Sequence, residues 1–183
     1  KHTVEINNLS TLRLAKLAKD SGVGRFVFAS SQSMYGISDT DEELSEDNSH
    51  KNPVTAYAKA KWDAEQEIQK LGTKDFIVTS FRPSTVFGAS PRLRCDIVFN
   101  NLVACAYTTG KIEILSDGTP WRPVVHVKDV CSAFISGLEA PENMCRTAGA
   151  FNYYSFDANH PFLDPPVQPL QKVSIYPVDI NFD

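Results

Sequence analysis

The run RFVFAS at residues 25–30 is a short and nearly continuous apolar stretch. Runs of this kind are typical of strands that lie inside a parallel sheet, with helices covering both faces. An apolar stripe over residues 4–21 predicts a helix before this strand, ending near Gly22. A second apolar run at residues 75–81 predicts another buried strand, and the pattern over residues 53–72 predicts a helix between the two strands.

The rest of the chain continues this alternation. The sequence predicts helices at residues 93–108 and 128–139, and extended segments at residues 112–115, 124–127, 150–153 and 172–178, with a turn at 117–120. Helices and strands that alternate in this way indicate an α/β fold, in which a parallel sheet carries helices on both faces. Residues 154–169 contain several prolines and show no periodicity.

Composition argues against several classes of protein. The chain has 183 residues and a net charge of −4, with no basic run, which argues against nucleic acid and anionic membranes as partners. No apolar run approaches the roughly 18 residues of a membrane span, and the first residues do not resemble a signal peptide. The four cysteines (Cys95, Cys105, Cys131 and Cys145) lack metal-ligand spacing. We therefore expect a cytoplasmic protein whose cysteines are reduced and lie mostly in or near the core.

Polar residues follow two of the predicted strands. Residues 30–33 come directly after the first, and residues 82–85 come directly after the second. Ligands of open parallel sheets bind beyond the carboxyl ends of the strands. We therefore expect these two clusters, together with the helix that lies between the strands in sequence, to meet at one crevice.

That helix carries Tyr57 and Lys61 in the stretch TAYAKAK, residues 55–61. Residues four apart share a helix face, and an ammonium close to a phenol favours the phenolate. The two side chains thus form a candidate pair for proton transfer. On spacing alone, a half-buried tyrosine beside a solvated lysine is the commoner arrangement.

Several motifs occur together and in order. FVFASSQSMYG at residues 26–36, followed by YAKAK at 57–61, resembles the extended short-chain dehydrogenase/reductase family. Within that family, the chain is similar to the NAD-dependent epimerase/dehydratase group that acts on nucleotide sugars. The resemblance extends to FRPSTVFG at residues 81–88, SPRLR at 90–94, DGTPWRPVVHV at 117–127 and Phe151-Asn152. It implies a Rossmann-like doubly wound parallel sheet with a small C-terminal substrate-binding region.

The resemblance also implies roles for individual residues. Ser31, Tyr57 and Lys61 would be catalytic. Tyr57 would act as the acid/base, Lys61 would be the cation that favours its phenolate form, and Ser31 would form a hydrogen bond with the reacting oxygen. The residues implied in binding NAD are Asn7, Ala29, Ser30, Tyr57, Lys61, Pro83, Ser84 and Thr85. The residues implied in binding a nucleotide sugar are Ser33, Thr85, Arg92 and Arg122.

Some of these residues have simpler alternatives. Asn7 could be a surface residue of the first helical turn, and Arg122 could be a surface arginine beside Trp121. Arg92 and the nearby Arg94 could simply face water. His126 lies in an apolar run, which favours a core histidine whose ring nitrogens are hydrogen-bonded over an acid or base.

The loop after Ser31 separates the reactions of the group. Dehydratases of the group carry Asp and Glu at the positions that Gln32 and Ser33 occupy in this chain. Glutamine and serine cannot act as an acid/base pair at neutral pH. The sequence therefore favours an NAD-dependent epimerase, which is an isomerase, over a dehydratase. A sugar dehydrogenase or reductase, and a non-catalytic cofactor-binding protein, are the alternatives.

Two departures from the family pattern stand out. No G-x-x-G-x-x-G fingerprint occurs in the sequence, which indicates that the chain begins partway through a Rossmann domain and could be inactive alone. The segment after Asn152 also differs from the family.

We expect residues 1–88 with 124–139 to form a partial NAD-binding domain, and residues 89–123 and 140–183 to form the substrate-binding region and tail. A homodimer through the Tyr57 helix is one expectation, in which Trp62 and Ile68 would suit either the interface or the core.

Overall fold

The computed structural model describes residues 1–37, 44–114, 123–141 and 148–153. The chain divides into two compact units. The first comprises residues 1–84 and 132–153, and the second comprises, among the described residues, 85–131. The predicted division into an NAD-binding and a substrate-binding domain stays a prediction. The described part of the chain contains no helix that is both long and apolar enough to cross a membrane.

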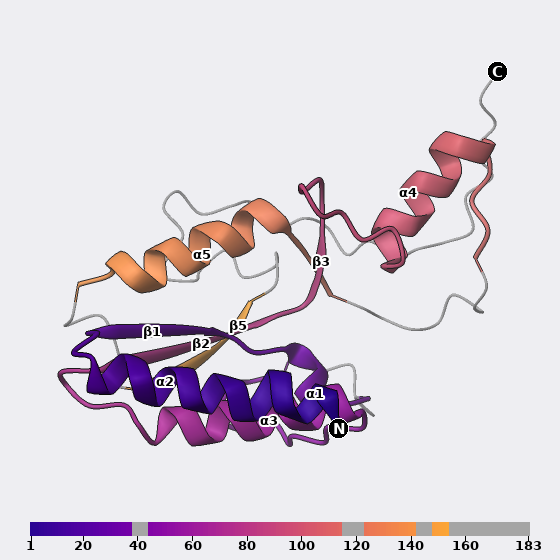
Figure 1. Cartoon of the computed structure of the whole chain (residues 1–183). Coiled ribbons are helices and arrows are strands. Elements are labelled where there is room, and N and C mark those ends of the chain that lie inside the picture. The colour runs from indigo at the N-terminus through magenta and orange to yellow at the C-terminus, as the bar shows by residue number, and fades with distance from the viewer. Residues whose placement is uncertain (38–43, 115–122, 142–147, 154–183) are drawn as a thin grey trace. The chain divides into compact units, whose positions relative to one another are not determined.

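The first unit is built on a three-stranded parallel sheet in the order β1-β2-β5 (Figure 1). The strands are β1 (Arg25–Ala29), β2 (Ile77–Pro83) and β5 (Ala148–Tyr153). β2 lies in the centre and is buried over almost its whole length, which confirms the expectation from its apolar run. β1 pairs with β2 alone among the described strands, and it is less buried than predicted because one of its edges is open.

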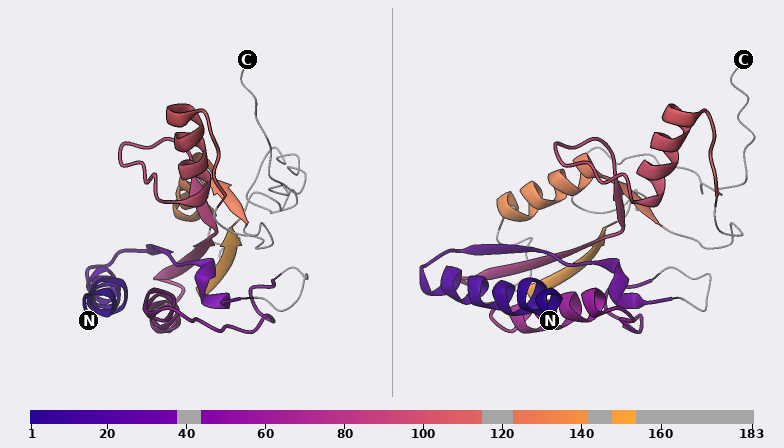
Figure 2. Two further views of the ribbon diagram at one scale, coloured as in Figure 1. Left: turned by 90° about the vertical axis from the view of Figure 1, so that its right-hand side faces the viewer. Right: turned by 45° about the vertical axis from the view of Figure 1, so that its right-hand side comes forward.

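Helices pack on both faces of this sheet, as predicted for a doubly wound fold (Figure 1). One face carries α3 (Ala56–Gln69) beside a continuous helical segment (Figure 2). That segment comprises α1 (His2–Val4), the π-helix η1 (Glu5–Leu9) and α2 (Ser10–Asp20). The other face carries the C-terminal part of α5 (Val127–Glu139), where the Phe134 ring lies 5.3 Å from that of Phe81.

The helix before β1 ends as its sequence predicts. The Gly22 N–H donates to the Lys19 carbonyl and the Val23 N–H donates to the Ala18 carbonyl, with Gly22 at a φ of 77°. Glycine adopts this left-handed conformation without steric cost, which is why helices often end at it. The π-helix within the segment was not predicted.

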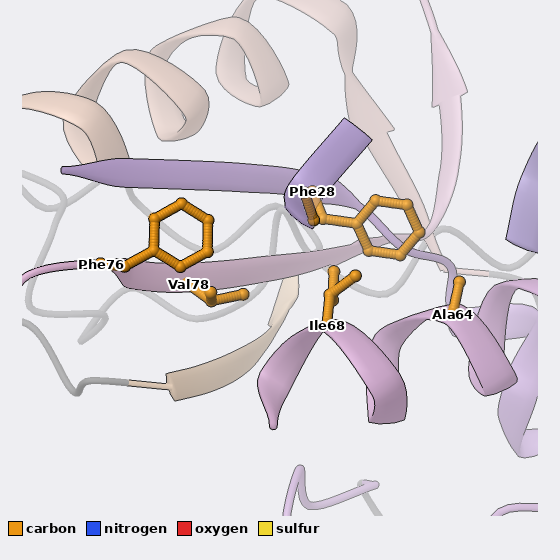
Figure 3. Close-up of a cluster of buried hydrophobic side chains, with 6 residues drawn as sticks. Phe28, Ala64, Ile68, Phe76 and Val78 are labelled. Atoms are coloured by element: carbon orange, nitrogen blue, oxygen red, sulfur yellow. The ribbon is translucent and has the colours of Figure 1, made fainter. Parts of the chain in front are cut away.

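The core of the first unit lies between α3 and the sheet. Phe28 of β1, Val78 of β2 and Phe76 just before β2 meet Ala64 and Ile68 of α3 (Figure 3). Ala64, Ile68 and Val78 are fully buried. Burial of apolar side chains contributes about 25 cal/mol per Å². This cluster therefore fixes α3 against β1 and β2.

The described residues of the second unit include a two-stranded parallel sheet and a long helix. β3 (Thr85–Phe87) pairs with β4 (Val124–His126), and α4 (Val98–Thr109) packs its Phe99 ring 4.4 Å from that of Phe87. The strand β3 was not predicted. The helix predicted at residues 93–108 begins later because Asn100 and Asn101 use their side chains to bind the carbonyls of Arg94 and Cys95, which shapes the preceding residues as a loop.

Three further expectations meet different outcomes. Residues 112–114 form no strand, so that prediction is wrong for them. The predicted turn at residues 117–120 and strand at 172–178 lie outside the described residues. Cys95, Cys105 and Cys131 are free thiols, as expected, but Cys95 and Cys131 are exposed, because one lies in the loop before α4 and the other on an outer face of α5. Their predicted burial is therefore wrong, and Cys145 lies outside the described residues.

Candidate active site

The carboxyl end of β1 carries the first polar cluster. The Ser30 N–H donates to the Phe81 carbonyl at 2.7 Å, so the backbone runs alongside β2 beyond the end of β1. Ser31 then caps the 3-10 turn η2 (Gln32–Tyr35), its Oγ accepting from the Ser33 N–H at 3.2 Å and from the Ser33 hydroxyl at 2.9 Å. The predicted catalytic Ser31 and substrate-binding Ser33 therefore lie together, Ser31 half-buried and Ser33 exposed.

The N-terminal turn of α3 carries the predicted acid/base. Thr55 caps the helix by accepting the Ala58 N–H at 3.1 Å, because its side chain replaces a missing helical carbonyl. The Tyr57 side chain in this turn is 44% exposed, which leaves its phenol within reach of a ligand. Lys61, one turn later, places its Nζ 5.8 Å from the centroid of the Tyr57 ring.

Lys61 joins this helix to the end of β1. Its Nζ donates to the Ala29 carbonyl at 2.8 Å and lies 4.8 Å from the centroid of the Phe28 ring. Burial of the ammonium lowers the pKa of Lys61 below its usual value. The hydrogen bond holds the helix that carries Tyr57 next to a residue only two positions before Ser31.

The end of β2 carries the second polar cluster. Pro83 ends the strand, and Ser84 follows it. The Oγ atoms of Ser84 and Ser30 are both buried, and neither has a hydrogen-bond partner among the residues that the structure describes. The two serines follow neighbouring parallel strands at the same edge of the sheet. Ser80, inside β2, has a third such hydroxyl. A buried hydroxyl without a partner costs about 1–3 kcal/mol, so a ligand group that bonded to Ser30 or Ser84 would remove that cost. Thr85 already belongs to the second unit, where its N–H donates to the Pro123 carbonyl at 3.3 Å.

Asn7 lies in the π-helix, on the segment that packs against α3. It is half-buried, and its Nδ2 donates to the Thr3 carbonyl at 3.1 Å. π-Helical turns within α-helices are frequent at functional sites. The structure thus places Asn7 on the neighbour of the Tyr57 helix, while its role with a cofactor stays a prediction.

The structure also shows a buried ionic cluster that the motif reading missed. Arg82 of β2 is 3% exposed and Glu65 of α3 is fully buried. The Nε of Arg82 lies 3.1 Å from Glu65 Oε1, and its Nη1 donates to the Tyr35 hydroxyl at 2.7 Å. Burial alone would lower the pKa of the Arg82 guanidinium, but the hydrogen bonds and charge of Glu65, together with Tyr35, raise it. The single charge of Arg82 within the apolar run of β2 was a signal for a buried partner, but the several charges of α3 do not indicate which of them pairs with it.

The remaining predicted residues lie elsewhere. Arg92 and Arg94 are exposed in the loop before α4, and Arg94 forms an ion pair with Asp96 at 2.6 Å. His126 is half-buried, with its Nδ1 accepting from the Lys128 N–H at 3.2 Å and its ring edge on Phe87, which agrees with a structural role. Arg122 lies outside the described residues.

Comparison with known proteins places this arrangement in context. The sequence model described as the NAD dependent epimerase/dehydratase family matches residues 1–152. The chain belongs to the NAD-dependent epimerase/dehydratase family. Its parallel sheet with helices on both faces is a partial Rossmann fold, as the family resemblance implied.

Family members of several activities are similar to the chain. The UDP-glucose 4-epimerase of Bacillus subtilis (strain 168) is 32% identical over 154 residues, which cover 73% of this chain and 44% of that protein. The dTDP-4-dehydro-6-deoxy-D-allose reductase of a Streptomyces species is 30% identical over 145 residues, covering 74% of this chain and 44% of that protein. The structure of MoeE5 in complex with UDP-glucose and NAD is 32% identical, with a TM-score of 0.67, and covers 81% of this chain and 48% of that chain. The chain thus spans less than half the length of each of these relatives.

Proposed function

We propose that the intact protein is an NAD-dependent epimerase of a nucleotide-activated sugar. The observation that carries this proposal is the position of the Lys61 Nζ, which lies 5.8 Å from the centroid of the Tyr57 ring and donates to the carbonyl of Ala29, two positions before Ser31. An acid/base, a cation and a hydroxyl are the groups needed to exchange a proton at a sugar hydroxyl. The similarity to a UDP-glucose 4-epimerase supports the proposal.

In this mechanism, NAD supplies a reversible acceptor for the hydride of a sugar carbon. Tyr57 removes the proton of the hydroxyl on that carbon and later returns it. The Lys61 ammonium stabilises the negative charge on the Tyr57 oxygen while it acts as base. Ser31 donates a hydrogen bond to the same sugar oxygen and so orients it as its charge changes.

The residues at the sheet edge suit a cofactor. The buried hydroxyls of Ser30 and Ser84 have no partner among the described residues, and each could both donate to and accept from NAD. Ala29 is exposed at the end of β1, where it pairs with Phe81, and Pro83 ends β2 two residues beyond Phe81. Together with Asn7 and Thr85, these residues would hold NAD.

The substrate would contact Ser33, Thr85, Arg92 and Arg122. An arginine fork can bind two oxygens of a diphosphate at once, which suits the two arginines to a nucleotide sugar. Gln32 and Ser33 supply no carboxylate next to Ser31. Epimerisation, which needs a single acid/base, therefore fits the site better than dehydration.

A sugar reductase or dehydrogenase is the second candidate. It would use the same three side chains, and the similarity to a dTDP-4-dehydro-6-deoxy-D-allose reductase favours it. The two reactions differ in whether the cofactor leaves after each turnover.

Cofactor retention distinguishes the candidates. The intact protein is purified, denatured and analysed by absorbance and mass spectrometry, and then assayed with UDP-sugars with and without free NAD(H). An epimerase is expected to release near-stoichiometric NAD and to need little added cofactor, whereas a reductase consumes NADH at the rate of turnover. A protein that neither contains nor binds NAD contradicts both candidates.

A further inference from the structure

We propose that Arg82 is a positioning residue, which sets the Tyr57 helix in place relative to the turn that carries Ser31. The inference rests on the proposed function, because that function requires Tyr57 and Ser31 to reach the same sugar oxygen. Arg82 touches neither of them. It acts through Glu65 on one side and Tyr35 on the other.

The first contact fixes the helix. Glu65 lies one turn after Lys61 and two turns after Tyr57, so all three share one side of α3. Arg82 donates from Nε to Glu65 Oε1 and Oε2 at 3.1 and 3.2 Å, and from Nη2 to Oε1 at 2.5 Å. Several charge-assisted bonds between a planar guanidinium and a carboxylate define direction as well as distance.

The second contact fixes the turn. The Nη1 of Arg82 donates to the Tyr35 hydroxyl at 2.7 Å and to the Glu46 carbonyl at 3.2 Å. Tyr35 is the last residue of η2, whose cap is Ser31. One guanidinium therefore joins the strand β2, the helix of Tyr57 and the turn of Ser31.

The surroundings hold the guanidinium in place. It lies 5.6 Å from the centroids of the Tyr35 and Trp62 rings, and Lys51 lies 5.6 Å from the Tyr35 ring and donates to the Glu46 carbonyl at 2.7 Å. After Tyr35, Gly36 has a φ of 74°, and a Cβ there would lie 2.3 Å from the Asn52 carbonyl oxygen. The segment around Glu46 and Lys51 is thus held close to Tyr35 and Arg82, and Gly36 packs closely against Asn52.

Stability alone does not account for this cluster. Removing two charges from water costs several kcal/mol per ion, and well-packed apolar residues in place of a buried ion pair are often neutral or stabilising. The Arg82–Glu65 pair instead supplies a fixed geometry at the boundary between core and site. A displacement of about 1 Å at a reacting group can reduce turnover about 100-fold.

Two substitutions that preserve side-chain shape test the proposal by turnover in the intact protein. Tyr35→Phe removes the hydroxyl that Arg82 binds, and Glu65→Gln removes the charge but keeps the shape. We expect kcat to fall about 10-fold for Tyr35→Phe and about 100-fold for Glu65→Gln, with KM and the NAD affinity changed less than about 3-fold. Glu67→Gln, on the same helix in the exposed pair with Lys70, is the matched control and is expected to leave kcat unchanged.

Amide hydrogen exchange provides a measurement that needs no substrate. The Met34 N–H donates to the Ser31 carbonyl and the Gly36 N–H donates to the Ser33 carbonyl, whereas the Ile77 N–H donates to the Gly24 carbonyl at the far end of the sheet. We expect Tyr35→Phe to speed exchange at Met34 and Gly36 at least 5-fold and to leave Ile77 unchanged. A purely structural role would change all three amides together.

The outcomes separate the two proposals. Wild-type kcat in folded Tyr35→Phe and Glu65→Gln proteins overturns the positioning role, while the proposed function stands. If the wild-type protein shows neither turnover nor NAD binding, the proposed function is overturned, and amide exchange decides alone. Faster amide exchange at Met34 and Gly36 alone then supports the positioning role of Arg82. Exchange that is unchanged, or that is faster at all three amides, overturns it.

Discussion

The two halves of α3 have opposite surroundings. In the first half, Tyr57 is 44% exposed beside a helix cap and only the small side chains of Ala58 and Ala60 are buried. In the second half, the larger side chains of Glu65 and Ile68 are fully buried, together with Ala64. Lys61 lies between the two halves and is half-buried. The helix thus presents its reactive group at an open end while the covered end anchors it. Substitution of Ile68 in the second half should therefore change stability, whereas substitution of Tyr57 or Lys61 should change turnover.

The largest loss of stability is expected for Ile68→Ala in the covered half. It leaves a cavity next to Phe28 and Val78, which should lower the free energy of unfolding by about 2–5 kcal/mol. Urea denaturation measures this loss, and the kcat of the folded fraction should stay close to wild type. Leu17→Ala on α2, at a side chain 63% exposed, is the matched control and should cost less than about 0.5 kcal/mol.

Lys61→Met should show the opposite pattern. It removes the cation beside the Tyr57 ring but keeps much of the aliphatic side chain, so kcat should fall about 100-fold with little change in melting temperature. Lys59→Met, at an exposed position on the same helix, should leave kcat unchanged. Equal kcat values for Lys61→Met and Lys59→Met would show that Lys61 has no role in the reaction.

Thr55→Ala should have a smaller effect at the open end. The substitution removes the oxygen that accepts the Ala58 N–H, and loss of such a cap costs about 1 kcal/mol. Thermal and urea unfolding measure the loss. Thr55→Ser retains the hydroxyl and should recover most of it, and failure of serine to do so would show that the cap is not the cause.

A weak pH dependence of stability should follow from Lys61. Burial lowers its pKa in the folded state, so between that value and the usual 10.5 the unfolded chain binds more protons than the folded one. The contribution of Lys61 to stability should therefore increase as pH rises through this interval. The difference in unfolding free energy between wild type and Lys61→Met, followed from pH 8 to about 10.5, should shift in favour of wild type. A constant difference would contradict the burial of a charged ammonium.

The sequence predicted the elements that periodicity and local signals define. The apolar runs of β1 and β2 and the stop at Gly22 each follow from nearby residues, and the structure confirms them. The short strand β3 was missed because three residues carry too little periodic signal. It forms through pairing with β4, whose residues lie about 40 positions later.

The candidate site was only partly accessible to the same reasoning. The spacing of Tyr57 and Lys61 put them on one face, but the hydrogen bond from Lys61 to Ala29 depends on how α3 packs on β1. The Arg82–Glu65–Tyr35 cluster joins three segments that sequence spacing does not relate. Such long-range polar contacts follow from tertiary packing, which one sequence does not specify through local pattern.

The most direct test of the account compares Tyr57→Phe with Tyr107→Phe in the intact protein. Both substitutions remove one hydroxyl from an exposed tyrosine, and Tyr107 on α4 is 91% exposed. The account predicts that Tyr57→Phe lowers kcat for nucleotide-sugar epimerisation by about 10²- to 10⁴-fold at an unchanged melting temperature, while Tyr107→Phe retains wild-type kcat. Wild-type turnover in the Tyr57→Phe protein would show that the phenol at the open end of α3 does not carry the proton.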